Sequence, residues 1–159
     1  MSSMPATLDR AGIASRVPHR GTMCLLDAME SCGADEIVCR IANHADAANP
    51  LRLDQQLPAA SALEYASQAM ALHGSLAAST GKPPTSGFLA SARDVRLHVD
   101  RLDTSPGPLR VRARRLAGDA GQAMYRFELQ DAHGRMLVEG RTTVVLDTPL
   151  VAPAPRGAR

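Results

Sequence analysis

Tryptophan is absent from this chain of 159 residues, and other aromatic side chains are scarce, with two Phe and two Tyr. Proteins that bind single-stranded nucleic acids stack the bases on aromatic rings and line the strand with positive charge. The formal net charge is only +2, which is too weak to hold a phosphate backbone. We therefore expect no nucleic-acid partner.

Cysteine is also scarce. Cys24, Cys32 and Cys39 are the three in the chain, and none forms a CxxC pair. An odd count without paired spacing does not favour a disulfide framework or a structural zinc site. Asp and His likewise lack the spacing of metal ligands. We expect reduced cysteines packed as small hydrophobic residues, no metal ion and no cofactor.

Long apolar runs are missing too, and the start of the chain does not resemble a secretory signal. A membrane-spanning helix needs about 18 or more apolar residues, so we expect a cytoplasmic protein without a membrane segment. The length fits one domain. The prediction is a single domain over residues 1–148, followed by a Pro-rich disordered tail over residues 149–159.

One long segment of the chain is rich in helix-forming residues. Ala, Leu, Met and Gln dominate residues 57–80, and Pro58 suits a first helical turn. Most side chains in the segment are small, so neighbouring backbone can pack closely around it. The sequence therefore predicts a helix over residues 57–80 that is enclosed by the rest of the protein.

Glu64 is a charged residue in this otherwise apolar helix. Burying an unpaired carboxylate is costly, so its presence indicates either catalysis or a structural ion pair. Gln68 follows four residues later, which places both polar side chains on the same side of the helix. Glu64 and Gln68 are therefore the first candidates for a functional site.

Strand-like runs with turn signals between them lie on both sides of the helix. They are residues Met23–Met29 and Glu36–Ile41 before it, and Gly87–Val99, Leu109–Leu116, Ala123–Gln130 and Arg135–Leu146 after it. Residues 43–57 have no clear periodicity and are expected to form a loop that leads into the helix. This order predicts an α+β fold in which a curled antiparallel sheet surrounds one central helix.

Three motifs give the chain a resemblance to a known family. Val17–Asp27 resembles the opening motif of beta-hydroxyacyl-acyl carrier protein dehydratases of the hotdog fold, and residues 57–69 resemble their helix motif MPG-x-x-x-x-E-x-x-x-Q. Residues 87–93 resemble the following strand, especially in the aryl polyene and fatty-acid-like branch, and would supply Phe88 and Leu89 to the substrate site. The resemblance covers most of the chain and implies a hotdog fold.

The resemblance also implies a reaction, the elimination of water from a 3-hydroxyacyl thioester to give an enoyl thioester. Glu64 corresponds to the helix carboxylate that helps the hydroxyl group to leave, and Gln68 would orient it or a water molecule. The backbone N–H groups of Ala59 and Ala60, at the positive end of the helix, would polarise the thioester oxygen.

The catalytic histidine of the family is not at its expected place. Asn49 is nearest to that position in the pattern, and an amide cannot act as a general base. His44 lies five residues earlier, and we interpret it as a solvated loop imidazole that would reach the site only if the loop were rearranged. His73 is on the opposite side of the helix from Glu64 and is expected in the core or an interface.

Three functions remain open from the sequence. The first is the dehydratase, with an acyl carrier protein and its phosphopantetheine-linked acyl chain as partner. The second is a hotdog acyl thioesterase, in which Glu64 would activate water. The third is a non-catalytic or half-site subunit. Because hotdog sites lie between two subunits, the chain would form a homodimer, or a heterodimer with a histidine-bearing hotdog partner.

Arginines alternate with apolar residues along one predicted strand, at Arg110, Arg112 and Arg114. Alternation of this kind is typical of a sheet with one solvated face. A more specific interpretation is a docking patch for an acidic carrier protein, to which Arg93 and Arg96 would contribute.

Overall fold

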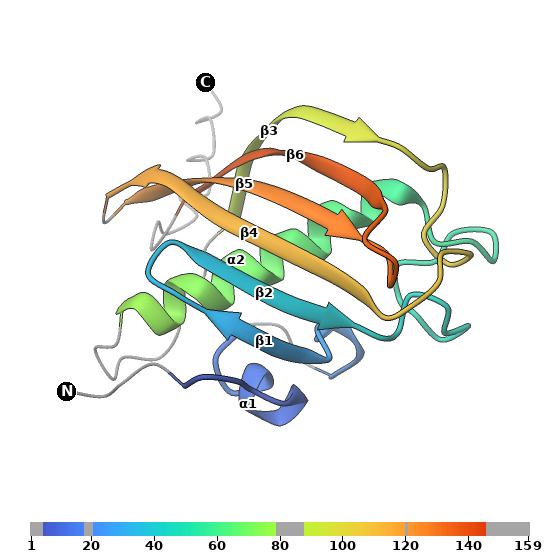
Figure 1. Cartoon of the computed structure of the whole chain (residues 1–159), viewed down its shortest axis with the longest axis horizontal. Coiled ribbons are helices and arrows are strands. Elements are labelled where there is room, and N and C mark those ends of the chain that lie inside the picture. The colour runs from blue at the N-terminus through green and yellow to red at the C-terminus, as the bar shows by residue number, and fades with distance from the viewer. Residues whose placement is uncertain (1–4, 18–20, 79–87, 120, 146–159) are drawn as a thin grey trace, which may run out of the picture.

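The computed structural model describes residues 5–17, 21–78, 88–119 and 121–145, with only the backbone described for Ala78 and Phe88. Six strands form one antiparallel sheet in the order β1-β2-β4-β5-β6-β3. They are β1 (Ala28–Cys32), β2 (Glu36–Ile41), β3 (Phe88–Leu97), β4 (Leu109–Gly118), β5 (Gln122–Gln130) and β6 (Met136–Val145). The sheet curls in front of the long helix α2 (Figure 1). The predicted architecture, a curled antiparallel sheet and a central helix, is confirmed.

The central helix begins with a short 3₁₀ turn, η2 (Ala59–Ser61), and continues as α2 (Ala62–Ala78). Ala62, Ala66 and Ala69 are completely buried, and α2 contacts strands β2, β4 and β5. Small side chains thus let the sheet backbone approach the helix, as the composition predicts. The predicted end of the helix lies outside the described residues.

The inner face of the sheet supplies most of the hydrophobic core. Val111 and Ala113 on β4 and Phe127 and Leu129 on β5 are fully buried, while the residues between them are exposed or half-buried. Truncation of a buried Phe to Ala typically costs about 3–5 kcal/mol. The arginines of β4 alternate outward, so the solvated outer face expected from the sequence is confirmed.

The predicted strand Met23–Met29 is only partly correct. Residues Gly21–Met23 form a 3₁₀ turn, η1, and β1 begins only at Ala28. The reason is the buried side chain of Gln68, which bonds to the carbonyl oxygen of Met23 and to the backbone N–H of Leu25. In a strand, these two backbone groups would have bonded to the neighbouring strand.

A short helix, α1 (Arg10–Ala14), lies beside β1 (Figure 1). Ile13 is its buried residue, and Leu8 pairs with Met29 through two backbone hydrogen bonds of 2.9 and 3.2 Å. The segment that contains Leu8 and α1 therefore covers the hydrophobic core next to β1. Residues 18–20 and the predicted tail over residues 149–159 lie outside the described residues.

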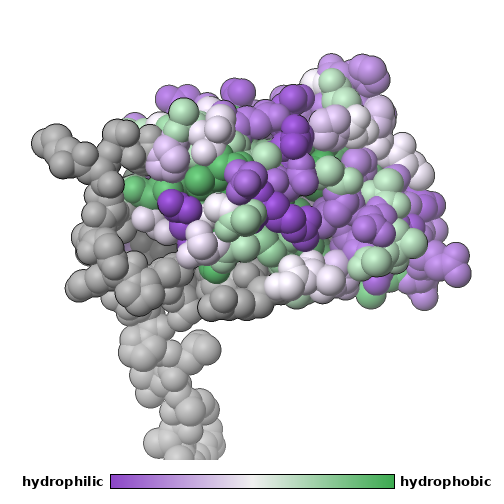
Figure 2. All heavy atoms as spheres, turned by 90° about the horizontal axis from the view of Figure 1, so that it is seen from below, coloured by the Kyte–Doolittle hydropathy of each residue, from purple (hydrophilic) through white to green (hydrophobic). Residues whose placement is uncertain are grey.

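Seen from the β1 side, the described surface is a mixture of hydrophilic and hydrophobic residues in which hydrophilic ones prevail (Figure 2). Within the described part of the chain, no helix has both the length and the apolar character needed to cross a membrane.

Candidate functional site

Glu64 lies in the first turn of α2 and is half-buried. Its Oε1 accepts a hydrogen bond of 3.3 Å from Nε2 of Gln68, one turn further along the helix. The structure therefore brings together the two polar side chains that the sequence singled out. A carboxylate held in this way on a mostly apolar helix has a defined direction, which general acid–base chemistry requires.

Gln68 is completely buried and fully hydrogen-bonded. Its Oε1 accepts from the backbone N–H of Leu25 at 2.9 Å, and its Nε2 also donates to the carbonyl oxygen of Met23 at 2.6 Å. The side chain therefore fastens the segment that follows the opening motif to the helix. Gln68 positions both this segment and the Glu64 carboxylate.

The start of the helix differs from the expectation. The backbone N–H of Ala59 donates to the carbonyl oxygen of Asp100 at 3.0 Å, so it is not available to polarise a thioester. This part of the sequence-based interpretation is wrong, because a segment far away in the sequence occupies the donor. Ala60 is exposed at the same helix start, four residues before Glu64, and stays a candidate donor.

Asp103 anchors the entry to the helix, and sequence reasoning missed it. Its Oδ1 accepts from the backbone N–H of Leu57 at 3.0 Å and from Nε of Arg101 at 2.9 Å, and the side chain is only 6% exposed. The hydrogen bonds from Arg101 and, to a lesser extent, from the Leu57 backbone hold the pKa of Asp103 well below its usual value. The spacing of Arg101 and Asp103, two residues apart, was the sign of this ion pair that the sequence offered.

Asn49 is buried, with 5% of its surface exposed. Its Nδ2 donates to the hydroxyl of Tyr65 at 2.8 Å and to the carbonyl oxygen of Asn43 at 3.0 Å, and its Oδ1 accepts from the N–H of Leu51 at 2.9 Å. Both donors and the acceptor of the amide are therefore occupied by this chain. Through its bond to Tyr65, the residue that follows Glu64, Asn49 holds the loop against α2.

His44 is not a solvated loop imidazole, and that interpretation is wrong. Only 5% of its surface is exposed. Its Nε2 lies 3.0 Å from the carbonyl oxygen of Ser105, and since a carbonyl only accepts, Nε2 carries the hydrogen. Among the described residues, Nδ1 has no hydrogen-bond partner. The loop before β4 covers the ring, because a Cβ on Gly107 would lie 2.3 Å from its Cε1.

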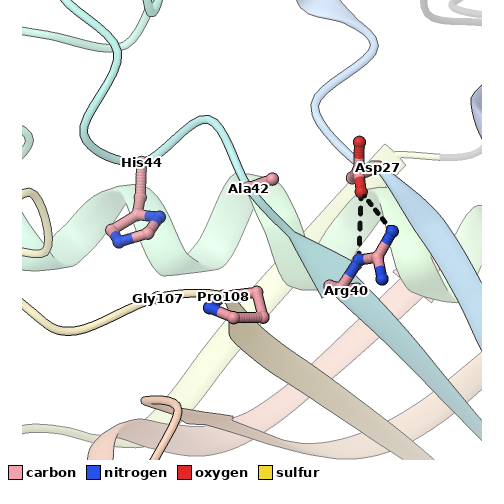
Figure 3. Close-up of a pocket in the computed structure, with 6 residues that line it drawn as sticks. All are labelled: Asp27, Arg40, Ala42, His44, Gly107 and Pro108. Carbon is pink, nitrogen blue, oxygen red and sulfur yellow. Dashed lines mark hydrogen bonds and ion pairs between the residues drawn. The ribbon is translucent and has the colours of Figure 1, made fainter.

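The imidazole of His44 borders a pocket of about 320 Å³ at the end of β2. Figure 3 shows His44 at one end of this pocket and the ion pair of Asp27 and Arg40 at the other, with Ala42 and Pro108 between them. Arg40 donates from Nε and Nη2 to Oδ2 of Asp27 at 3.0 and 2.8 Å. No residue of α2 lines the pocket, and no hydrogen bond joins His44 to Glu64, because Nε2 bonds to Ser105 and Nδ1 has no partner among the described residues.

His73 is a core residue, in agreement with one of the two expectations for it. It is fully buried, with Nδ1 2.7 Å from the Tyr125 hydroxyl and Nε2 3.0 Å from the Gly33 carbonyl oxygen. Burial raises the pKa of Tyr125 to about 12, so the hydroxyl stays a donor to Nδ1. These two hydrogen bonds account for the buried position of His73, which is a structural residue with no part in catalysis.

The other predicted site residues lie on the edge strand β3. Leu89 is partly buried and packs against the core, and the side chain of Phe88 lies outside the described residues. Arg93 and Arg96 are exposed on the same strand. Within the described ranges, no group of three or more His, Cys, Asp and Glu side chains could hold a metal ion.

A family model decides the classification. The model described as ApeP dehydratase, of the ApeP-like family, matches residues 11–151. The chain belongs to the ApeP-like family of dehydratases. The match includes Glu64, Gln68 and every strand of the sheet. The resemblance to dehydratases noted in the sequence, and the dehydratase function that it implies, are confirmed at the level of this family. No curated protein matches the chain.

Solved structures agree with this fold. A chain of the dehydratase heterocomplex ApeI:P from Xenorhabdus doucetiae is 21% identical with a TM-score of 0.76, and the match covers 86% of this chain and 91% of that one. AziG from S. sahachiroi is 16% identical, with a TM-score of 0.55 and coverage of 74% and 88%. A thioesterase from Haemophilus influenzae is 15% identical, with a TM-score of 0.52 and coverage of 79% and 80%. The hotdog fold is confirmed.

Proposed function

We propose that this ApeP-like chain contributes Glu64 to a composite dehydratase site whose general base is a histidine of a different hotdog subunit. The substrate is a 3-hydroxyacyl thioester on an acyl carrier protein. The observation that carries the proposal is the contrast between two side chains. Glu64 is fixed by Gln68 at 3.3 Å, whereas Asn49, nearest to the histidine position of the family, is an amide with its hydrogen bonds already used.

The elimination needs three groups. A base removes the proton from the carbon next to the thioester carbonyl, and the electron pair becomes the new carbon–carbon double bond. A donor stabilises the negative charge that develops on the thioester oxygen. The backbone N–H of Ala60, an exposed residue, is the candidate for this task. Glu64, in its protonated form, gives its proton to the departing β-hydroxyl group, which leaves as water. Gln68 keeps the carboxyl group directed and does not exchange protons.

The free edge of the sheet supports a paired assembly. β3 is ten residues long, and among the described residues it pairs with β6 alone. An exposed edge of this length is a template for another strand. The similar ApeI:P structure is a heterocomplex, which supports a heterodimer in which the two sheets join edge to edge. The free cysteines Cys24 and Cys39 are buried, in keeping with a reducing, cytoplasmic location.

The test is an assay of the purified chain, alone and mixed with a histidine-bearing hotdog partner. The substrate is a 3-hydroxyacyl thioester on a carrier protein, and enoyl product and free thiol are measured separately. Without a base the chain alone should dehydrate about 10²- to 10⁴-fold more slowly than the mixture, which corresponds to about 2.7–5.5 kcal/mol of barrier. The molecular mass in solution shows whether the subunits pair.

Two results would contradict the proposal. Rapid dehydration by the chain alone that is lost in a His44→Ala variant would mean that the loop moves and brings His44 to the site. Free thiol without enoyl product would instead favour the acyl thioesterase, in which Glu64 directs a water molecule at the thioester.

A further inference from the structure

Four arginines lie in one row across the outer face of the sheet. The strand register pairs Arg114 on β4 with Arg126 on β5, Arg126 with Arg141 on β6, and Arg141 with Arg93 on β3. All four side chains are exposed. We call these residues the arginine row. Figure 1 shows that α2 lies on the other side of the sheet, so the row is not part of the wall around Glu64.

The fold does not require this arrangement. Like charges that face each other on neighbouring strands destabilise a sheet. Arg126 is 3.3 Å from Glu139, and Arg141 pairs with Asp94. Within the described ranges, Arg93 and Arg114 have no ion-pair partner. Glu36 on β2 faces Arg114 in the register but forms its ion pair with Arg112. The positive charge at the ends of the row is therefore only partly compensated.

Neighbouring cations on the same face are arranged differently. Arg40 and Arg110 also face each other across strands, but each has its own carboxylate: Asp27 lies 2.8 Å from Arg40, and Glu30 lies 2.7 Å from Arg110. Arg112 pairs with Glu36 on β2 at 3.8 Å. Each of these three arginines thus forms an ion pair, whereas within the described ranges only Arg126 and Arg141 do so in the row.

Exposed hydrophobic side chains adjoin the row. Leu116 on β4, two residues beyond Arg114, is 47% exposed, and Met124 on β5, two residues before Arg126, is 41% exposed. Positive charge next to an apolar strip complements a helix that carries acidic residues on one face and apolar residues beside them.

We propose that the arginine row binds an acidic amphipathic helix of the acyl carrier protein. Neighbouring strands are about 4.8 Å apart, so the row presents cations at nearly the spacing of side chains three and four residues apart on a helix, about 5–6 Å. A helix lying across the strands would face all four arginines within about three turns. The proposal rests on the proposed function, from which it takes the identity of the partner.

The row ends on the strand that leads to the site. Arg93 is on β3, and the chain continues from β3 to Asp100, whose carbonyl oxygen holds the N–H of Ala59 at the start of the central helix. A carrier protein bound along the row would therefore lie over the edge at which a second hotdog subunit joins.

The experiment uses the chain together with its histidine-bearing hotdog partner. Steady-state kinetics are measured with the 3-hydroxyacyl group on the carrier protein and, in parallel, on free pantetheine. The double variant Arg114→Gln and Arg126→Gln should raise KM for the carrier-bound substrate about 3- to 10-fold, with kcat unchanged and the pantetheine substrate unaffected. The matched control is Arg110→Gln with Arg112→Gln, which removes the same charge from the same face outside the row and should change KM less than 2-fold.

A direct binding measurement with fluorescently labelled carrier protein completes the test. The row variant should bind more weakly than the control variant, and the difference should shrink as the salt concentration rises. Equal KM values in wild type and row variant, equal effects in both double variants, or a row effect on free pantetheine would overturn the docking proposal. If neither substrate gives enoyl product, the proposed function fails, and the binding measurement alone then decides on the row.

Discussion

The side-chain amide of Asn49 donates to the hydroxyl of Tyr65 at 2.8 Å, and the same hydroxyl donates to Oδ1 of Asn43 at 3.0 Å. Tyr65 is fully buried, and burial raises the pKa of its hydroxyl, which therefore stays protonated as a donor. The three side chains form a closed polar network between the loop and α2. It includes Tyr65, the residue that follows Glu64, and Asn49, the residue nearest to the family's histidine in the sequence pattern.

An Asn49→Asp substitution should destabilise the protein. The shape is kept, but the two amide donors are lost, and a carboxylate oxygen is turned toward the carbonyl oxygen of Asn43. Loss of hydrogen bonds by buried groups costs about 1–3 kcal/mol for each unsatisfied group. Urea unfolding followed by circular dichroism measures the change. An unaltered midpoint would show that the network does not hold the loop.

Much of the fold can be predicted from the sequence, because strands β2, β4 and β5 each bury one face. Alternation on β4 and β5 reflects a core on one side and water on the other, and it gives their positions to within about two residues. The exception is Met23–Met29, where apolar residues favoured a strand. The side chain that prevents it, Gln68, lies 43 residues after Leu25, and local patterns do not carry such contacts.

The site was predictable only where its residues share one helix. Glu64 and Gln68 are four residues apart, so helical geometry alone puts them together. Ala59 and His44 were misjudged because segments far away in the sequence act on them: Asp100 takes the N–H of Ala59, and Ser105 binds the ring of His44. When a loop far away in the sequence buries a residue, the sequence around that residue shows no periodic pattern that would reveal it.

Replacement of Glu64 by Gln tests its part in the reaction. The amide keeps the size and can still bond to Gln68, but it cannot give a proton to a leaving hydroxyl group. Turnover in the mixture with the histidine-bearing partner should fall about 10²-fold or more, while the melting temperature stays close to that of the wild type. Glu36→Gln, at the half-buried first residue of β2, is the control. Full activity of Glu64→Gln, or loss of its fold, would remove the carboxylate from the mechanism.

A Gln68→Leu substitution should lower both stability and turnover. The N–H of Leu25 and the carbonyl oxygen of Met23 would lose their buried partner, at a cost of about 2–4 kcal/mol. Among the described residues, the hydroxyl of the neighbouring Ser67 bonds to the carbonyl oxygen of Leu63 alone, within the helix. Ser67→Ala is therefore a control that should change stability by less than about 0.5 kcal/mol. Equal stabilities of both variants in urea would contradict the positioning function of Gln68.

The packing of His44 can be tested through a glycine. A methyl group on Gly107 would lie 2.3 Å from Cε1 of the imidazole, so Gly107→Ala must displace the ring or the loop before β4. Overpacking of this kind typically costs about 1–3 kcal/mol. In Gly33→Ala the nearest atom would be 3.9 Å away, and this control should be nearly neutral. Thermal unfolding that ranks the two variants the other way round would show that His44 is not confined.

Asp103 should make the stability depend on pH in the acid range. Its pKa is lowered in the folded protein, first by the hydrogen bond from Arg101, relative to about 3.9 in an unfolded chain. Between the pKa of Asp103 in the folded protein and its pKa in the unfolded chain, the unfolded state binds more protons. The free energy of unfolding therefore rises with pH in this range. The contribution is complete above about pH 5 and is lost as the pH falls below about 4 toward the folded-state pKa.

An Asp103→Asn variant isolates this contribution. The amide cannot pair with Arg101 as a charge, so the variant should be about 1–3 kcal/mol less stable at pH 7. Because the ionised form is what the fold stabilises, the difference from the wild type should shrink as the pH is lowered from 5 to 3. Urea titrations at several pH values measure it, with Asp54→Asn on the exposed loop as the control. A difference that stays constant over this range would mean that Asp103 acts through packing and not through its charge.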